Sequence, residues 1–467
     1  MIETYFEIGY TLVTVLLLGF FINRSSQKEL SRRGEIKWWV SFGIIFNLLS
    51  FSWLYTVYPL IWMPEGLTQI LGIGLLQLIL SVSSGLTFAV VGYTFFYARS
   101  ISNHKRPFVV ATAFTVAEMI RSMVISLLYY GEGTTIDLHF NAGTIGNALS
   151  TTPLVELAYY GGTFALTFFL TYLVYSLLSL PLKKSVVHFL LVFGIFLFTH
   201  FAIPINTPGK NVVIGVVTSE VPTSDGEDLK RRRGGSNESI AKLIIEDRDK
   251  KDILVLPEDA RFLSTLQKEQ RARVIEQNMG SLIIDGETFS KDDKLATISL
   301  FYETVTQKTV GKGKELLLPF NEYIPHFFDT IFSFFIGDEL DTYKSKHTYT
   351  PLHSGKVITF KGVRVSTLIC SEILSYRMIE NVGDEDPEIV FFQSRLNVFN
   401  NNPLFLLHLR SFSKIAAAQI RTTIISSNNY APSYMISGRG EIMETIPLST
   451  SYHEVTLSKK GEVILKR

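Results

Sequence analysis

The feature that most constrains this chain is a set of long apolar segments confined to its first 205 residues. A helix needs roughly 20 mostly apolar residues to cross a bilayer, because no water is present there to satisfy its backbone amides. The third segment is long enough to tilt or to include a turn at the membrane surface. The sequence therefore predicts a six-helix transmembrane domain over residues 1–205. The six segments cover about residues 5–23, 39–59, 68–98, 107–130, 153–180 and 185–203.

Lysine and arginine are unevenly distributed among the connections between these segments. Three connections are basic, namely residues 24–37, 99–106 and 183–184. The opposite three contain neither residue, namely 1–7, 60–67 and 131–152. Basic connections stay on the cytoplasmic side of a membrane, so we expect a multi-pass protein whose two ends lie outside the cytoplasm. The first segment lacks the basic start of a signal peptide and is expected to be retained.

Charge and cysteine content narrow the possible functions. The 467-residue chain has a formal net charge of +1, which offers no electrostatic footprint for nucleic acid. The run KRRR at 230–233 is expected in a solvated loop, with contact to anionic lipid as the alternative. Cys370 is the only cysteine, so an intrachain disulfide and a zinc–thiolate cluster are both excluded. A lone cysteine is usually a small buried apolar residue, and only its surroundings give it another role.

One acidic and one basic residue lie within the fourth apolar segment. Glu118 and Arg121 are three residues apart and therefore share one face of a helix. Charged side chains within a membrane are costly and usually face the interior of a helix bundle. We expect the pair to fix helix packing; contact with a lipid headgroup or a reaction cavity is the alternative.

After residue 206 the pattern changes to short apolar runs between polar stretches. Alternating strands and helices predict a layered α/β domain over residues 206–467. Strands are expected at 212–217, 253–257, 295–302, 363–370, 388–393 and 422–429. Helices are expected at 236–247, 264–279 and 403–420, and a hairpin at 436–445.

Three residues at predicted strand ends are chemically suited to act together. Glu258 follows LVLP, Lys314 precedes LLLPFNEYIP, and Cys370 ends STLIC. A thiol becomes a useful nucleophile when a base takes its proton and a cation stabilises nearby negative charge. Each residue alone is ordinary, because a lone Glu or Lys is usually solvated. Together they supply the base, the cation and the nucleophile.

The sequence around these residues resembles the nitrilase (carbon–nitrogen hydrolase) superfamily. The matching stretches are LVLPEDA around Glu258, KELLLPFNEYIP around Lys314 and Glu322, and LICSEI around Cys370 and Glu372. Within that superfamily the chain resembles the apolipoprotein N-acyltransferases of bacterial membranes, over roughly residues 38–445. The membrane half contributes SWLYTVY (52–58), FTVAEMIRS (114–122) and PLVELAYYGGTFALTFF (153–169). The resemblance implies an α-helical transmembrane bundle that carries a nitrilase-like α-β-β-α sandwich.

The resemblance also implies an acyltransferase that works through a thioester on Cys370. Glu258 would be the general base, while Lys314 and the backbone amide of Ser371 would stabilise the oxyanion. Glu322 would orient Lys314. Glu372 would support the pocket.

The substrates implied are a membrane phospholipid as acyl donor and a diacylglyceryl-prolipoprotein as acceptor. The acyl chain would move to the N-terminal amine of the lipoprotein's diacylglyceryl-cysteine. No metal, other cofactor or nucleic acid is implied. The protein would lie in the bacterial cell membrane with an extracytoplasmic catalytic domain.

The chain departs from that family in three places. Additional helices near each end are not expected here, and Ser371 stands where Tyr is common. SRLNVFN (394–400) replaces an Asn-Asp-x-Trp-Phe stretch. These changes concern the lipid and acceptor pockets more than the catalytic centre. Two alternatives therefore remain: a membrane-tethered nitrilase-type amidase, in which water replaces the amine, and a non-enzymatic membrane scaffold, against which the intact Glu258, Lys314 and Cys370 argue.

Overall fold

The structure is a computed structural model of the chain. It describes residues 2–27, 30–57, 66–131, 133–221, 227–247, 249–291, 294–353, 357–399 and 402–465. Parts of the connections at 24–37, 60–67 and 131–152, the end of SWLYTVY and the last residue of SRLNVFN lie outside these ranges.

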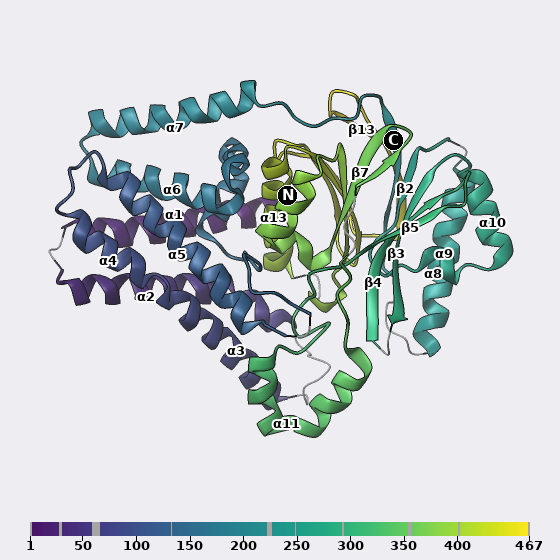
Figure 1. Cartoon of the computed structure of the whole chain (residues 1–467), viewed down its shortest axis with the longest axis horizontal. Helices are drawn as coiled ribbons and strands as arrows, with labels where there is room; N and C mark the ends of the chain where they lie inside the picture. Colours follow the sequence, from purple (N-terminus) through teal and green to yellow (C-terminus); the bar gives the residue numbers. More distant parts are fainter. Residues whose placement is uncertain are drawn as a thin grey trace.

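Long apolar helices form one end of the molecule, and two β-sheets form the other (Figure 1). Six helical segments of the described chain are long and apolar enough to cross a membrane, as the sequence predicts. The helices are α1 (Ile2–Gln27), α2 (Arg32–Ser50), α3 (Leu67–Leu86), α4 (Ala89–Ala98), α5 (Arg106–Leu128), α6 (Gly162–Ser179) and α7 (Leu182–Ala202). Three 3-10 turns accompany them: η1 (Ser52–Val57), η2 (Ile145–Thr151) and η3 (Pro153–Tyr160).

Two of the predicted segments are divided in the structure. The third consists of α3 and α4, separated at Thr87 and Phe88. The fifth begins as the 3-10 turn η3 and becomes an α-helix only at Gly162. Gly162 has a φ of 57°, a conformation that a β-carbon disfavours. The prediction of one helix over the apolar run at 153–180 therefore holds only for the part from Gly162 on. The part before it is a 3-10 turn.

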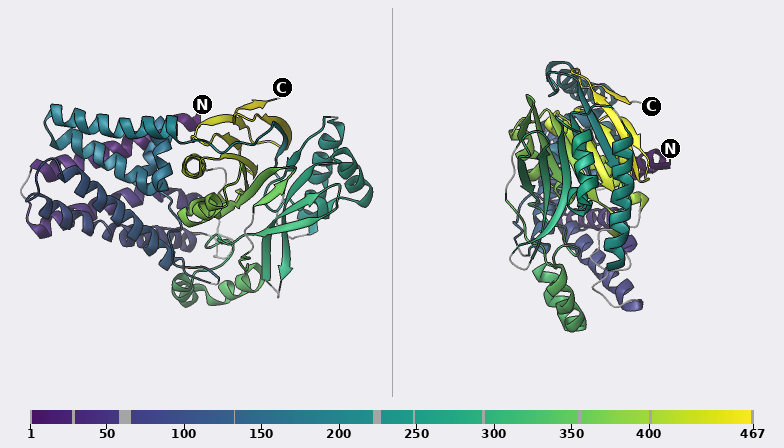
Figure 2. Two further views of the ribbon diagram at one scale, coloured as in Figure 1. Left: turned by 45° about the horizontal axis from the view of Figure 1, so that its top comes forward. Right: turned by 90° about the vertical axis from the view of Figure 1, so that its right-hand side faces the viewer.

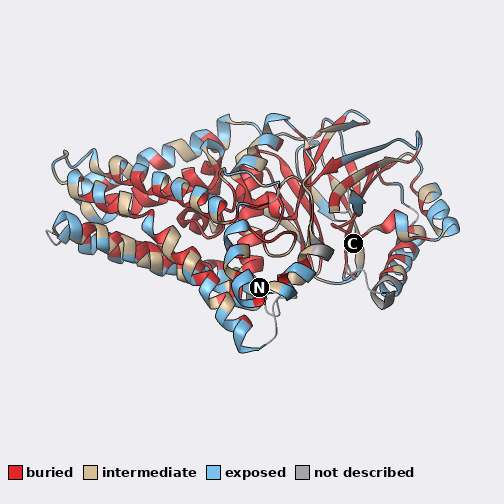
Figure 3. Cartoon of the chain, turned by 60° about the horizontal axis from the view of Figure 1, so that its bottom comes forward, coloured by how far each residue is buried: buried red, intermediate tan, exposed pale blue. Residues whose placement is uncertain are grey.

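Helices α2 and α3 approach closely at two glycines. A β-carbon on Gly43 would lie 2.8 Å from the Cα of Gly85, so neither position has room for a side chain. Helices surrounded by lipid gain little from burying apolar side chains against one another, because lipid tails are equally apolar. Small residues let their backbones pack closely instead. By contrast α7 lies at the edge of the bundle, and apolar side chains such as Leu190, Leu191 and Phe198 are exposed (Figure 3). Such a surface suits lipid.

The soluble half contains two sheets stacked face to face (Figure 2). The seven-stranded sheet has the order β13-β12-β1-β2-β3-β4-β5, and the six-stranded sheet has the order β11-β10-β9-β8-β7-β6. The first sheet contains β1 (Val212–Thr218), β2 (Ile253–Val255), β3 (Leu282–Lys291), β4 (Lys294–Glu303), β5 (Thr309–Gly313), β12 (Ser451–Leu457) and β13 (Val463–Leu465). The second contains β6 (Ile358–Phe360), β7 (Val363–Ile369), β8 (Ile389–Arg395), β9 (Thr423–Asn429), β10 (Ser433–Ile436) and β11 (Ile442–Ile446).

Helices cover the outer face of each sheet, which gives four layers. Apolar side chains such as Ile214 and Phe391 pack between the sheets. On the outer face of the seven-stranded sheet lie α8 (Glu227–Glu246), α9 (Phe262–Thr265) and α10 (Lys268–Gln277). On the other side lie α12 (Tyr376–Asp384) and α13 (Pro403–Ile420). Helix α11 (His326–His347) projects away from the sheets, near the end of α3 (Figure 1). Strands alternating with helices thus form the predicted α/β domain, in α-β-β-α layers.

The structure corrects the expectation for the basic run at 230–233. These residues lie within α8, which begins at Glu227, and not in a loop. Arg231 and Arg232 are exposed, but Arg233 is buried. Because one side of a surface helix faces the core, only part of a basic run on it remains solvated.

Helix α13 joins the two halves of the molecule. It lies between the six-stranded sheet and the helical bundle (Figure 1). Glu7 of α1 pairs with Arg410 of α13 at 3.2 Å. Ser150 of η2 donates a hydrogen bond to Ser411 at 3.0 Å. The α/β domain and the bundle are therefore in direct polar contact.

Candidate active site

The three predicted residues converge where the ends of strands from both sheets meet. Glu258 lies three residues beyond β2, Lys314 directly follows β5, and Cys370 directly follows β7. The Lys314 ammonium donates to Glu258 Oε1 at 2.9 Å and to Glu322 Oε1 at 2.8 Å. All four side chains are buried. Residues separated by more than 100 positions in the sequence therefore form one enclosed group.

The backbone at Cys370 has an unusual conformation. Its φ is 47°, in the left-handed region that residues with a β-carbon rarely adopt. Cys370 also begins the 3-10 turn η4 (Cys370–Leu374), so the chain turns sharply at the end of β7. Strained conformations of this kind occur preferentially at functional sites. The turn brings the thiol to the strand edge where Glu258 and Lys314 lie.

Burial keeps the thiol protonated at neutral pH. Loss of solvation and the negative charge of Glu258 raise the pKa of Cys370 to about 12, and Lys314 only partly opposes them. Burial also raises the pKa of Glu258, although Lys314 and Arg395 act in the opposite direction. A thiol in this state does not react as a preformed thiolate, so attack requires a base that removes its proton during the reaction. Glu258 is placed to be that base.

Lys314 keeps its charge despite complete burial. Desolvation alone would lower its pKa, but the negative charges of Glu258 and Glu322, and that of Cys370 when its thiol is ionised, outweigh desolvation and raise it. The second oxygen of Glu322 accepts the Leu318 amide at 2.6 Å, which fixes this carboxylate. Glu322 therefore holds the Lys314 ammonium through an ion pair.

Glu372 and Ser371 lie within η4 and bond to the backbone around the site. Glu372 accepts the amide of Ile369 and that of Glu315, each at 2.8 Å. The Ser371 hydroxyl donates to the Leu316 carbonyl. These contacts link the turn that holds Cys370 to the segment that follows Lys314. Glu372 is thus a support for the backbone on both sides.

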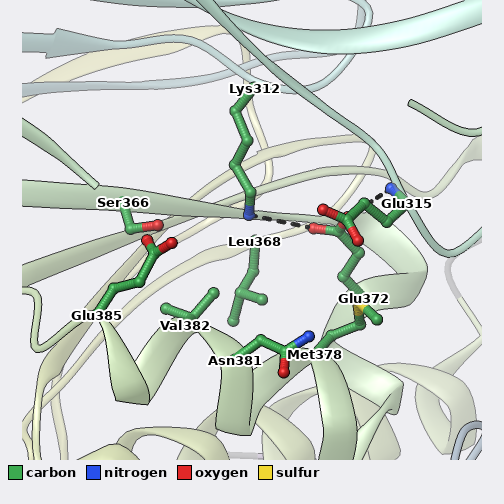
Figure 4. Close-up of a pocket in the computed structure, with 9 residues that line it drawn as sticks. All are labelled: Lys312, Glu315, Ser366, Leu368, Glu372, Met378, Asn381, Val382 and Glu385. Carbon is green, nitrogen blue, oxygen red and sulfur yellow. Dashed lines mark hydrogen bonds and ion pairs between the residues drawn. The ribbon is translucent and has the colours of Figure 1, made fainter. Parts of the chain in front are cut away.

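A pocket adjoins Glu372 on the side of α12 (Figure 4). The Lys312 ammonium points into it toward the Glu372 carboxylate, at 3.6 Å. Glu258, Lys314 and Cys370 do not line this pocket. Its walls are Lys312, Glu315, Ser366, Leu368, Glu372, Met378, Asn381, Val382 and Glu385.

Two residues at the site were not predicted as functional from the sequence. The backbone N–H of Arg395, at the end of β8, donates a hydrogen bond to the Cys370 sulfur. His139, in the connection after α5, contacts the Ser375 hydroxyl at 2.7 Å through Nδ1. Arg395 lies in SRLNVFN, so its signal was a polar residue at a strand end, as for the other three. His139 gave no signal, because its role depends on a contact with a residue 236 positions away.

The ion pair of α5, Glu118 with Arg121, bonds to the connection that follows α5 and contains His139. Glu118 pairs with Arg121 and accepts the Ile145 amide at 3.0 Å. Arg121 donates to the Ala142 carbonyl at 3.1 Å. The Asn141 amide in turn donates to the Leu374 carbonyl of η4 at 2.8 Å. The pair therefore fixes the connection on which the nucleophile turn rests.

One group of carboxylates in the described chain has a spacing that could hold a metal ion. Asp247, Asp249 and Glu454 form this group. The Lys251 ammonium already pairs with Asp247 at 2.7 Å and neutralises part of the charge. These residues lie next to α8 and on β12, apart from Glu258, Lys314 and Cys370.

Comparisons with known proteins give structural matches alone. No family model and no curated protein matches the sequence. Solved structures similar to this chain include an amidase from Nesterenkonia sp., with 12% sequence identity and a TM-score of 0.38 over 54% of this chain and 92% of that one. Nit3 of Saccharomyces cerevisiae, a member of the nitrilase superfamily, has 11% identity and a TM-score of 0.40 over 54% and 92%. A carbon–nitrogen hydrolase from Helicobacter pylori has 9% identity and a TM-score of 0.39 over 54% and 90%.

Proposed function

We propose that this protein is a membrane acyltransferase of the nitrilase type, which moves a fatty acyl chain from a phospholipid to the N-terminal amine of a diacylglyceryl-cysteine lipoprotein. One observation carries the proposal. The turn that begins with Cys370 is hydrogen-bonded, through the Leu374 carbonyl and Ser375, to the connection that follows the apolar helix α5. The nucleophile thus lies at the junction with the helical bundle, where lipid-anchored substrates can reach it.

In the first half-reaction, Glu258 removes the Cys370 proton as the sulfur attacks the carbonyl carbon of a phospholipid ester. The oxyanion forms beside the Lys314 ammonium and the backbone amide of Ser371. When the oxyanion collapses, the ester C–O bond breaks and protonated Glu258 returns its proton to the leaving oxygen. Lysophospholipid departs, and the acyl chain remains on Cys370 as a thioester.

In the second half-reaction, the lipoprotein amine attacks the thioester carbonyl. Glu258 takes a proton from the amine, and Lys314 again faces the developing oxyanion. The C–S bond then breaks, the sulfur regains a proton from Glu258, and the lipoprotein leaves as an amide. Each step needs a base that alternates between its two protonation states, which suits a carboxyl whose pKa burial has raised.

Mass spectrometry of lipoprotein N-termini, in cells with and without the protein, tests the proposal. We expect the N-terminal acyl chain only where the protein is present, together with release of lysophospholipid by the purified enzyme. Hydrolysis of an amide without lysophospholipid would instead identify an amidase that uses water. A reporter fused after Arg467 should be active in its extracytoplasmic form alone, since the lipoprotein acceptor of the second half-reaction lies outside the cytoplasm.

A further inference from the structure

Arg395 brings a second positive charge to the reaction centre from the opposite sheet. It ends β8, in the six-stranded sheet, whereas Glu258 follows β2 of the seven-stranded sheet. Its guanidinium pairs with Asp259 at 2.8 Å and contacts Tyr349. Asp259 directly follows Glu258, and its own φ of 56° shows that the chain bends sharply there. Arg395 therefore bonds to the residue next to the proposed base.

We propose that Arg395 is a positioning residue whose guanidinium holds the turn that carries Glu258 and keeps that carboxyl in its ionised, proton-accepting form. The inference rests on the proposed roles of Glu258 and Cys370. It concerns the side chain of Arg395 alone, because the backbone N–H that bonds to the Cys370 sulfur is present whatever residue occupies the position.

The balance of charges around Glu258 explains why a second cation matters. Lys314 is shared between Glu258 and Glu322, so one ammonium faces two carboxylates. Asp259 brings a third carboxylate to this group. Burial and Glu322 favour the neutral form of Glu258, whereas Lys314 and Arg395 favour the charged form. Among the described residues, the ionisable groups that act on Glu258 or on its turn include Asp259 and Arg261 on the turn itself, Lys314 after β5, Glu322 before α11, Cys370 on η4 and Arg395 on β8. Tyr343 on α11 and Tyr349 after it lie near Arg395.

Arg261 provides a matched control. It pairs with the other oxygen of Asp259 at 2.6 Å, and its side chain is 16% exposed against 13% for Arg395. Arg395 favours the charged form of Glu258, and its backbone N–H reaches the Cys370 sulfur. Removing either arginine therefore breaks an ion pair with Asp259. Only the loss of Arg395 should change the ionisation of the base.

The test is the rate at which iodoacetamide alkylates Cys370, followed by mass spectrometry as a function of pH. Cys370 is the only cysteine, so the full-length protein can be used in detergent without further substitutions. In Arg395→Met we expect the acid-side midpoint of the rate to move up by about 1 pH unit, as for loss of an opposite charge within a few ångströms. In Arg395→Lys the midpoint should return to that of the unaltered protein. In Arg261→Met the midpoint should not move.

An Arg395→Met profile that superimposes on that of the unaltered protein would overturn the proposal, as would an equal shift in Arg261→Met. Thermal melting of each variant shows whether it has folded. If Arg395→Met does not fold, Arg395→Gln keeps hydrogen-bond donors for Asp259 without the charge, and the same shift is expected. Failure of the proposed function has a different signature, because lysophospholipid release would then be absent while the alkylation profile still shifts.

Discussion

The two halves of the molecule each bury a group of charged side chains, and the two groups differ in how the oxygens of their carboxylates are bonded. In the half that consists of long apolar helices, both oxygens of Glu118 have partners, Arg121 and the Ile145 amide. In the soluble half, Glu258 uses one oxygen for Lys314, and its second oxygen has no hydrogen-bond partner among the described residues. A buried unsatisfied carboxylate oxygen is costly. In the proposed reaction, this oxygen accepts the Cys370 proton.

This difference separates structural from chemical roles for ions of similar burial. Glu118 has no oxygen left to accept a proton from a substrate, and it holds the connection after α5 in place. Glu258 has a spare oxygen beside a protonated thiol. The sequence left two roles open for Glu118 and Arg121: fixing helix packing, or contact with a lipid headgroup or a reaction cavity. The complete burial of both side chains favours packing.

Substitution of the nucleophile should have the largest effect. Cys370→Ala should abolish both acyl transfer and covalent labelling by a radioactive phospholipid, because the chain has no other thiol. Retained transfer in this variant would contradict the thioester route. Cys370→Ser should accumulate an acyl-ester, since serine is a poorer leaving group, and mass spectrometry of the intact protein would detect it.

Loss of the cation should have the next largest effect. Lys314→Ala should slow acyl-enzyme formation by roughly 100-fold or more, the usual cost of removing an oxyanion donor. Lys314→Arg should restore only part of the rate, because a planar guanidinium does not replace a compact ammonium held by two carboxylates. Single-turnover release of lysophospholipid measures both. An unchanged rate in Lys314→Ala would mean that the ion pairs of Lys314 with Glu258 and Glu322 are structural, like the pair of Glu118 and Arg121.

The ion pair of α5 should affect stability more than chemistry. Arg121→Met leaves Glu118 without its partner and should destabilise the fold by about 3–5 kcal/mol, whereas the double variant with Glu118→Gln should cost less. Melting temperatures in detergent show whether the single variant is less stable than the double variant. The pH dependence of Cys370 alkylation should not move in either variant. A shift of that profile would mean that the two ion groups are not separable in function.

The contact between His139 and Ser375 should give the smallest effect. His139→Ala removes two hydrogen bonds, to Ser375 and to Thr135, each worth about 1 kcal/mol, from the connection that supports η4. We expect a several-fold fall in the rate of acyl-enzyme formation with little change in the apparent KM for phospholipid. His139→Asn, which can still bond to Ser375, should recover most of the rate. A fall in melting temperature without a fall in rate would show that the contact holds the fold alone.

The sequence by itself determined what depends on local pattern. Apolar length predicts the six membrane helices, and alternation predicts most of the central strands and all of α13, because spacing along the chain decides which face is buried. It also singled out Glu258, Lys314 and Cys370 as a possible group. It missed α11 and α12, and it placed residues 230–233 in a loop, since helix boundaries depend on weak local signals.

Only the tertiary structure decided how distant residues act on one another. The bond between Lys314 and two carboxylates, the positive φ of Cys370 and the spare oxygen of Glu258 follow from the packing of two sheets. The pairing of Arg395 with Asp259 joins residues that are 136 positions apart. Periodicity cannot encode such contacts, because they depend on which strand ends meet across the sandwich. The sequence therefore identifies the acidic, basic and thiol side chains. The fold determines which of them lie close enough to form ion pairs and hydrogen bonds.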